Sequence, residues 1–338
     1  MLRRDDVTAA WQPAIWAKSA AAKSSDLQTI ADCIDRWVAY RDDDAQGVIR
    51  DAMRPIIGPQ GLDAAQSLID TLLDELLADL IPSAPVDLVT TIAQSLPAKL
   101  VTTLLGCSSP DMEANLPAWS DHIRGFLASD QERTAAQAAN TAQAIHAMQE
   151  AVRTTAESGV PGPLLRALLD AVDASTIEHE DAIANAVLLL FAGFETTSRL
   201  LGRVLQILVA LPPAHRPATP DQAQYLVDFV LRKRPPVTQL ARRVHLDTDR
   251  CGCPMRTNDM LHLRLDASDS TTPELLAFGG GRHACPGGRI GTAEAVSCVL
   301  AVATQLEDLH AAGPPTESGG RVTALPVRFR RLGPRSAR

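Results

Sequence analysis

The sequence contains few aromatic residues and no long uninterrupted apolar segment. Phe, Trp and Tyr make up only 4% of its 338 residues, whereas Ala and Leu are abundant. This composition favours helices over sheets, because aromatic and β-branched residues are the ones that strands prefer. The longest apolar stretch, residues 182–194, is interrupted by Asn185 and is too short to cross a bilayer. We therefore expect a mainly α-helical protein that does not span a membrane.

The sequence also lacks an excess of basic residues and a dense set of cysteines. Its formal net charge is −8, which argues against a general nucleic-acid binder. Its 6 cysteines are too few and too scattered for a disulfide scaffold. The first residues, MLRRDDVTAAW, have no apolar core of the kind that a signal peptide needs. These absences predict a cytoplasmic protein that is held together by a hydrophobic core.

Apolar residues recur at helical spacing along most of the chain. The predicted helices are 64–80, 88–105 (one helix, or two broken at Pro97), 118–128, 134–156, 164–172, about 178–211, 221–234 and 288–306. At 1.5 Å per residue the helix of 178–211 would be about 50 Å long, so its middle must be buried. Short strand-like patterns occupy only 237–265, and the absence of a βαβ alternation argues against a nucleotide-binding parallel sheet.

The most informative segment is the glycine-rich loop of residues 278–288, FGGGRHACPGG. Its glycines allow the backbone to approach a flat ligand closely. Backbone N–H groups at the start of the helix that follows would favour the thiolate form of Cys285, and such a thiolate is a suitable axial ligand for haem iron. A lone cysteine is more often structural, and glycines also form dinucleotide loops, but this loop fits the G-x-G-x-x-G pattern only loosely.

The spacing F-x-x-G-x-H-x-C-x-G closely resembles the haem-binding signature of the cytochrome P450 family. The resemblance covers about residues 5–327. It implies a mainly α, P450-like helical fold with a reduced β region, in which the helix of about 178–211 lies over the haem. It also implies a single haem-binding domain over 1–338 and a haem b cofactor whose iron is bound by Cys285. The residues that it places against the haem are Phe278, Gly279, His283 and Gly287 in the loop, and Ala192 and Gly193 in the long helix.

A second motif lies in the long helix. Residues 192–197, AGFETT, resemble the A-G-x-[D/E]-T-T motif of the same family. The resemblance implies that Glu195 and Thr196 are catalytic and relay protons through water into the apolar pocket. Taken alone, the same residues would be two threonines in a packed helix beside a solvated glutamate.

Three regions resemble the parts of the family that bind the haem propionates. Residues 37–53 include Arg50, which matches an arginine of the family, while Gln46 stands where a histidine is usual and can still donate a hydrogen bond. His283 is a further partner. An arginine after Pro235-Pro236 is the last, and Arg242 and Arg243 both remain open for it. Each of these residues could instead be an ordinary surface charge.

The chain departs from the family pattern in three places. The family's first helix and first strands are missing, and the meander segment before residue 276 is shortened. The E-x-x-R motif keeps Arg232 but has Phe229 in place of the glutamate. Removing one partner of a buried charged network is costly, so we expect Arg232 to be paired elsewhere or turned toward solvent.

The resemblance implies a P450-type monooxygenase that oxidises a small organic molecule in secondary metabolism. Electrons would come from a separate redox protein such as a ferredoxin, for which seven basic residues between 232 and 256 form a candidate docking surface. Use of peroxide, redox-neutral haem chemistry, a haem-based sensor and a non-catalytic accessory subunit remain as alternatives. Cys251-Gly252-Cys253 is interpreted as a turn, because two thiols alone do not complete a metal site.

Overall fold

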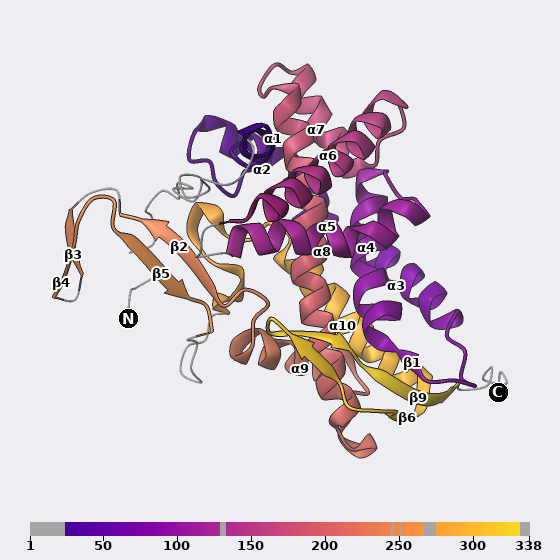
Figure 1. Cartoon of the computed structure of the whole chain (residues 1–338). Helices are drawn as coiled ribbons and strands as arrows, with labels where there is room; N and C mark the ends of the chain where they lie inside the picture. The colour runs from indigo at the N-terminus through magenta and orange to yellow at the C-terminus, as the bar shows by residue number, and fades with distance from the viewer. Residues whose placement is uncertain (1–23, 129–132, 245–246, 251, 267–274, 332–338) are drawn as a thin grey trace.

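The computed structural model describes residues 24–128, 133–244, 247–250, 252–266 and 275–331, and these are mainly helical (Figure 1). The helices are α1 (Ser24–Ile34), α2 (Asp44–Ile57), α3 (Leu62–Ala78), α4 (Ser95–Leu105), α5 (Pro110–Ala128), α6 (Ala135–Glu157), α7 (Pro163–Asp173), α8 (His179–Ala210), α9 (Pro220–Lys233) and α10 (Gly288–Gln305). The expected positions of the helices between residues 64 and 306 are therefore confirmed to within a few residues, except that α5 begins eight residues earlier, at Pro110.

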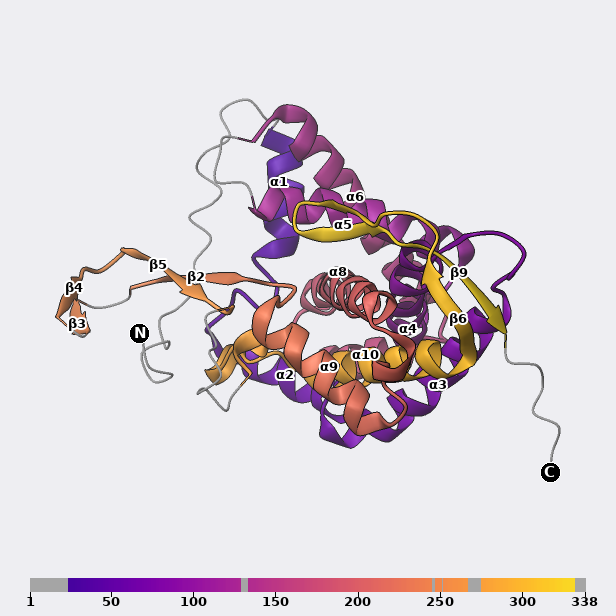
Figure 2. The ribbon, with the colours of Figure 1, turned by 90° about the horizontal axis from the view of Figure 1, so that it is seen from below.

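Helix α8 runs through the middle of the molecule. Figure 2 looks almost along its axis and shows α4, α9 and α10 around it. Residues 182–188, apolar apart from Asn185, are buried on every side of the helix, as expected of a helix in the middle of a core. The expected long central helix is thus confirmed, and its ends differ from the prediction by one residue.

One polar side chain interrupts this apolar stretch, and it links α8 to the segment that follows α1. Asn185 is fully buried. Its amide oxygen accepts a hydrogen bond from the backbone N–H of Val38 at 2.8 Å, and its amide nitrogen donates to the carbonyl of Arg36 at 2.9 Å. Both backbone groups therefore keep a partner inside the protein, which buried polar groups require.

The expected break at Pro97 lies elsewhere. Val89–Gln94 form a π-helical turn that leads directly into α4, so the change of geometry comes before the proline. Pro97 lies in the first turn of α4, where its missing N–H would have no partner within the helix. At its other end α4 stops at Gly106, whose φ is +82°. A Cβ there would lie 2.3 Å from the backbone nitrogen of Gly162, so only glycine allows α4 and the start of α7 to meet this closely.

The strands form small antiparallel sheets at two sides of the helical body (Figure 1). They are β1 (Val86–Asp87), β2 (Gln239–Arg243), β3 (Thr248–Arg250), β4 (Cys253–Met255), β5 (Met260–Arg264), β6 (Leu306–Ala311), β7 (Thr316–Ser318), β8 (Arg321–Ala324) and β9 (Pro326–Arg331). Strands β2 to β5 lie within the expected strand region of 237–265, with Leu240 opposite Leu263. The C-terminal strands β6 to β9 were not expected, and β1, β9 and β6 form a sheet of three strands.

One hydrophobic cluster connects the helices and the C-terminal sheet. Its buried members extend from Ile30 in α1 to Phe329 in β9 and include much of α8 and α10. Among the described helices, none is long and apolar enough to pass through a membrane.

Candidate active site

A cavity of about 390 Å³ lies between α8 and the loop that carries Cys285. Its wall is mostly apolar, and its aliphatic side chains come from helices far apart in the sequence. They include Leu100, Leu104, Leu188, Leu189, Leu200 and Leu240. This is the arrangement expected of a small-molecule site, in which a few polar groups are placed in an apolar enclosure.

The Cys285 loop is folded back on itself at the cavity. The backbone N–H of Cys285 donates to the carbonyl of Phe278 at 2.9 Å. Gly279 adopts a φ of +66°, a conformation that residues with a side chain rarely take. Phe278, Gly279, Cys285 and Gly287, which the resemblance places against the haem, all line the cavity.

The thiol of Cys285 faces the cavity, and its surroundings have opposing effects on its pKa. Desolvation by the surrounding protein raises its pKa. Hydrogen bonds from the backbone N–H groups of Gly287 and Gly288 act in the opposite direction, as does the charge of Arg50. The N–H groups at the start of α10 are thus placed where the sequence predicted them, and a bound cation would complete the stabilisation of a thiolate.

Arg50 and His283 also line the cavity on the side of the loop. Arg50 donates from Nη2 to the carbonyl of Ala284 at 2.8 Å, which ties α2 to the loop. His283 Nε2 lies 2.9 Å from a carboxylate oxygen of Asp42. Burial lowers the pKa of His283, and Asp42 opposes this effect. Asp42 is a member of the site that the sequence did not identify, because nothing in its local pattern connects it with residue 283.

The remaining candidates for the propionates are placed differently. Gln46 is buried but does not line the cavity: it donates to the carbonyl of Arg282 at 3.2 Å and accepts from Arg282 Nε at 3.1 Å. Arg242 is buried beside the cavity wall, close enough to His283 for its charge to lower the histidine pKa. Its Nε has no hydrogen-bond partner. Arg243 lies in β2, and its side chain is outside the described part of the structure.

Helix α8 supplies the opposite wall. Ala192, Gly193 and Thr196 line the cavity, as predicted. A Cβ on Gly193 would lie 3.3 Å from Cγ2 of Val101, so glycine here permits close contact with α4. The Thr196 hydroxyl donates to the carbonyl of Ala192 at 2.8 Å and remains at the cavity surface.

Glu195 points away from the cavity into a cluster of arginines. Its carboxylate oxygens lie 2.6 Å from Arg199 Nε, 3.3 Å from Arg124 Nε and 3.5 Å from Arg321 Nη1. Burial raises the pKa of Glu195, and the three guanidinium groups oppose that rise. The structure therefore brings Thr196 to the cavity with Cys285 but does not bring Glu195 there.

Glu294 of α10 is a cavity-lining carboxyl that the sequence did not identify. It is 2% exposed, and its Oε1 has no hydrogen-bond partner. Burial raises its pKa well above the ordinary carboxyl value and so favours the protonated form. A signal was available, because Glu294 occupies the i+4 position between the buried residues Ile290 and Cys298 and so interrupts an apolar helical stripe.

The altered E-x-x-R region is visible at the end of α9. Phe229 is 47% exposed there. Arg232 is half-buried and takes part in an interaction within the protein. In the described part of the chain, no group of three or more His, Cys, Asp or Glu side chains could hold a metal. Cys253 lies exposed in the β3–β4 hairpin, consistent with a turn, while Cys251 is outside the described residues.

Comparisons with known proteins agree with one another, although no family model matches the chain. The sequence is 29% identical to the erythromycin C-12 hydroxylase of Saccharopolyspora erythraea over 264 residues, 70% of this chain and 65% of the hydroxylase. It is 29% identical over 295 residues to the cytochrome P450 monooxygenase PikC of Streptomyces venezuelae, 79% of this chain and 68% of PikC. The beta-dihydromenaquinone-9 omega-hydroxylase of Mycobacterium tuberculosis is 22% identical over 306 residues, and the chain spans 62% of its length.

Solved structures show the same fold. The crystal structure of CalO2 superposes with a TM-score of 0.79 at 23% identity, covering 90% of this chain and 82% of CalO2. The epothilone B-bound cytochrome P450epoK superposes with a TM-score of 0.78 at 18% identity, covering 95% of this chain and 86% of that one. In sequence and in fold, this chain is similar to cytochrome P450 proteins.

Similarity to the P450 family implies a haem-iron cofactor, and the side chains around the cavity of this chain fit one. A thiol with two backbone N–H donors faces the cavity, and a glycine with a positive φ lies beside it. Arg50, His283 and the unpartnered Nε of Arg242 gather at the edge of the cavity beyond the loop. Cations at that edge suit the carboxylates of a haem, and the apolar wall suits its ring.

Proposed function

We propose that this chain is a haem-thiolate oxidoreductase that oxidises a small organic molecule, with Cys285 as the axial ligand. The observation that carries the proposal is the Cys285 thiol at the wall of an apolar cavity, where it accepts hydrogen bonds from Gly287 and Gly288. The relatives named above are hydroxylases and monooxygenases, which supports an oxidative reaction.

Different residues around the cavity would bind different parts of haem b. Cys285 would bind the iron, and Arg50, His283 and Arg242 would meet the propionates. Gln46 would not meet the propionates itself but would help to position His283. It accepts a hydrogen bond from Arg282, and its amide nitrogen lies 3.4 Å from His283 Nδ1. Phe278, Gly279 and Gly287 would contact one face of the ring, and Ala192 and Gly193 would leave room above the other. Bound haem would supply the oxidising chemistry.

Two groups of this chain can hold a proton at the cavity wall. The Thr196 hydroxyl is bonded to Ala192 and can also accept a hydrogen bond from a group inside the cavity. The protonated carboxyl of Glu294 is the other. We retain the proposal that Glu195 relays protons to Thr196. In the structure its carboxylate is paired with Arg199, so this ion pair would have to open and water would have to link Glu195 to Thr196.

The substrate class follows from the wall of the cavity. Apolar side chains dominate it, so the site would bind a largely apolar organic molecule by burying its surface. The erythromycin hydroxylase and the epothilone-bound P450 are named for natural products, which supports a natural-product substrate and a role in secondary metabolism.

We propose that electrons reach the haem from a separate ferredoxin-type protein in the cytoplasm. The basic residues between 232 and 256 remain the candidate docking surface, with one change. Arg242 is buried beside the cavity and so cannot be part of it, whereas Lys233 and Arg234 are exposed at the end of α9. An acidic partner would be attracted to such a surface.

A reduced carbon monoxide spectrum tests the proposal. The purified protein is loaded with haem, reduced and exposed to carbon monoxide, and thiolate ligation is expected to give a strongly red-shifted Soret band. Cys285→Ser should abolish the red shift, because a hydroxyl is a poor iron ligand at neutral pH. Cys253→Ser, which changes an exposed cysteine in the β3–β4 hairpin, is the matched control and should leave the spectrum unchanged.

The outcomes are distinct. A chain that binds no haem after reconstitution would contradict the cofactor assignment and favour an accessory subunit. A red-shifted band that survives in Cys285→Ser would contradict the choice of ligand.

A further inference from the structure

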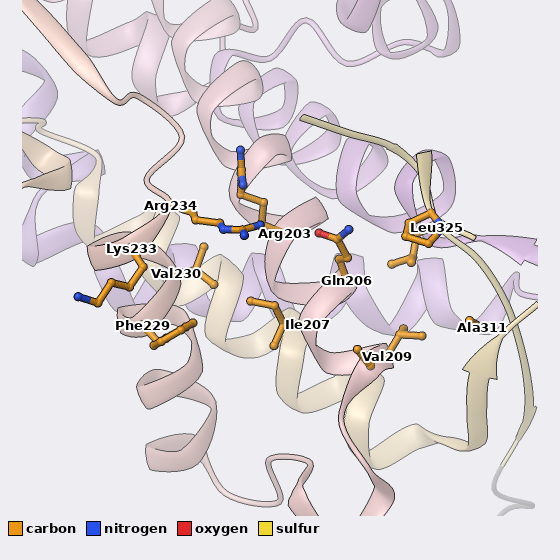
Figure 3. Close-up of a pocket in the computed structure, with 12 residues that line it drawn as sticks. Arg203, Gln206, Ile207, Val209, Phe229, Val230, Lys233, Arg234, Ala311 and Leu325 are labelled. Atoms are coloured by element: carbon orange, nitrogen blue, oxygen red, sulfur yellow. The ribbon is translucent and has the colours of Figure 1, made fainter. Parts of the chain in front are cut away.

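A second cavity lies near the end of α8, and it shares no lining residue with the cavity of Cys285. It measures about 540 Å³ and is enclosed by α8, the last turns of α9 and the C-terminal strands (Figure 3). Ligand pockets in proteins typically measure about 300–1,000 Å³, so the space suits a small molecule. Its wall has an apolar part and a cationic part.

The apolar part is centred on Phe229. This side chain is 47% exposed, and Figure 3 shows it close to Val230 and Ile207. Tyr225, one turn earlier on the same face of α9, is 77% exposed. Phe229 thus offers apolar surface at the edge of the cavity against which a ligand could pack. A molecule in the cavity would remove part of Phe229 from water.

The cationic part consists of Arg203 and Arg234. Figure 3 shows the side chain of Arg234 extending toward Arg203, while Lys233 points away from both. Burial lowers the pKa of Arg203, the charge of Arg234 lowers it further, and the charge of Glu317 opposes both effects. Within the described ranges of the chain neither arginine forms an ion pair, so two like charges lie close together and neither has a carboxylate in direct contact.

The hydrogen bonds that Arg203 makes within the protein do not use all of its N–H donors. Arg203 donates to the carbonyl of Gly320, but its Nε is buried and has no hydrogen-bond partner. The nearest carboxylate that acts on Arg203 is that of Glu317, and it already accepts a hydrogen bond from Gln206 at 2.7 Å. A cation in this state would gain from an anion that enters the cavity.

We propose that this cavity binds a small amphiphilic carboxylate, with its anionic end between Arg203 and Arg234 and its apolar body against Phe229 and Ile207. The two requirements act together. An inorganic anion would leave the apolar wall exposed, and a neutral apolar molecule would leave the two arginines without a counter-charge.

Octanoate and octan-1-ol form a matched pair of probes, since they share the apolar chain and differ in the charge at its end. Each is titrated by calorimetry into the full chain, once with haem added and once without it. We expect octanoate to bind and octan-1-ol to bind at least about tenfold more weakly, because a charge-assisted hydrogen bond is lost.

Substitution of the arginines assigns the binding to this cavity. In Arg203→Gln/Arg234→Gln the Kd of octanoate should rise at least about tenfold, while that of octan-1-ol should change by less than about twofold. Phe229→Ala should weaken both probes alike. The control Arg54→Gln/Arg166→Gln removes two exposed arginines elsewhere and should leave both affinities unchanged. Arg234 is exposed, so Arg234→Gln alone keeps the test available if Arg203→Gln impairs folding.

Three results would overturn the proposal. They are no binding of octanoate at millimolar concentration, the same Kd in the arginine variant as in the original chain, and an equal loss of affinity in the control variant. The second would place octanoate in the cavity of Cys285, and the third would reduce the effect to net charge. None of these outcomes depends on whether Cys285 binds iron.

Discussion

Glu294 shows how much one buried residue can add to a site. Its carboxyl lies in the wall of the Cys285 cavity, and its Oε1 lacks a hydrogen-bond partner. The cost of burying an ionised carboxylate is far larger than that of burying a neutral acid, so the protein keeps the proton. The same burial that makes the group a proton donor makes it a source of pH-dependent stability.

The sign of that dependence follows from the raised pKa. Folded protein retains the Glu294 proton, whereas unfolded chain releases it above the ordinary glutamate pKa of about 4.3. The contribution of Glu294 to stability therefore falls as pH rises above that value, by about 1.4 kcal/mol per pH unit until the folded pKa is reached. Glu294→Gln cannot ionise, so its melting temperature relative to the original chain should increase from pH 5 to pH 8.

Thermal melts across this pH range measure the difference. Glu150→Gln serves as the control, because Glu150 has 57% of its side chain exposed and should give a difference that does not vary with pH. Parallel curves for Glu294→Gln and the original chain would show that Glu294 is ionised in the folded protein.

Sequence patterns found the cavity residues that belong to local motifs and missed those that do not. Cys285 and Thr196 each lie in a short signature, and both line the cavity. Glu195 lies in the same signature as Thr196, but neighbouring residues on a helix differ by about 100° in direction, and only one of them faces the cavity. Arg199 is an i+4 neighbour in α8, but the other two arginine partners come from α5 and β8, which no local pattern could predict.

Among the elements, α8 depends on one polar side chain for its connection to the segment after α1. Asn185 satisfies the N–H of Val38 and the carbonyl of Arg36, and the neighbouring Val38 and Ala39 line the cavity. Asn185→Leu keeps the approximate size but leaves two backbone groups without partners. Each such loss costs about 1–3 kcal/mol, so we expect a destabilisation of about 2–6 kcal/mol.

Urea unfolding with a shared m-value measures this loss. Asn115→Leu is the control, since Asn115 bonds only to the carbonyl of Asp111 on the exposed side of α5 and should cost less than about 1 kcal/mol. Equal losses in the two variants would mean that the buried hydrogen bonds of Asn185 contribute nothing specific.

The predictability of an element depends on how regular its pattern is. Helix α8 was located to within one residue at each end because its long apolar pattern is continuous and Pro212-Pro213 follow it. Strand β6 was missed because its burial does not alternate: a bulge lies between Glu307 and His310, and Asp308 has a φ of +49°. A shift of register hides the period-two pattern by which a strand is recognised.

At the scale of the whole molecule, one hydrophobic cluster joins α1 to β9. We expect such a core to unfold as a unit if the prediction of a single domain is right. Differential scanning calorimetry should therefore show one transition with equal calorimetric and van't Hoff enthalpies. Haem should raise its midpoint, because a ligand that binds only the folded state stabilises it.

The control is the chain without haem, which should also melt in one transition at a lower temperature. Two resolved transitions would contradict the single-domain prediction, and an unchanged midpoint on loading would contradict specific haem binding.

Helix α8 forms part of both cavities, and its two contributions are adjacent. Leu200 lines the cavity of Cys285 and Arg203, three residues later, lines the second cavity. One helical turn therefore separates the two, at about 1.5 Å of axial rise per residue. Thermodynamic linkage is reciprocal: if an occupant of the second cavity changes the affinity of the first for its substrate by some factor, the substrate changes the affinity of the second by the same factor. If the shared turn couples the two cavities, the affinity of either ligand can be followed by titrating the other.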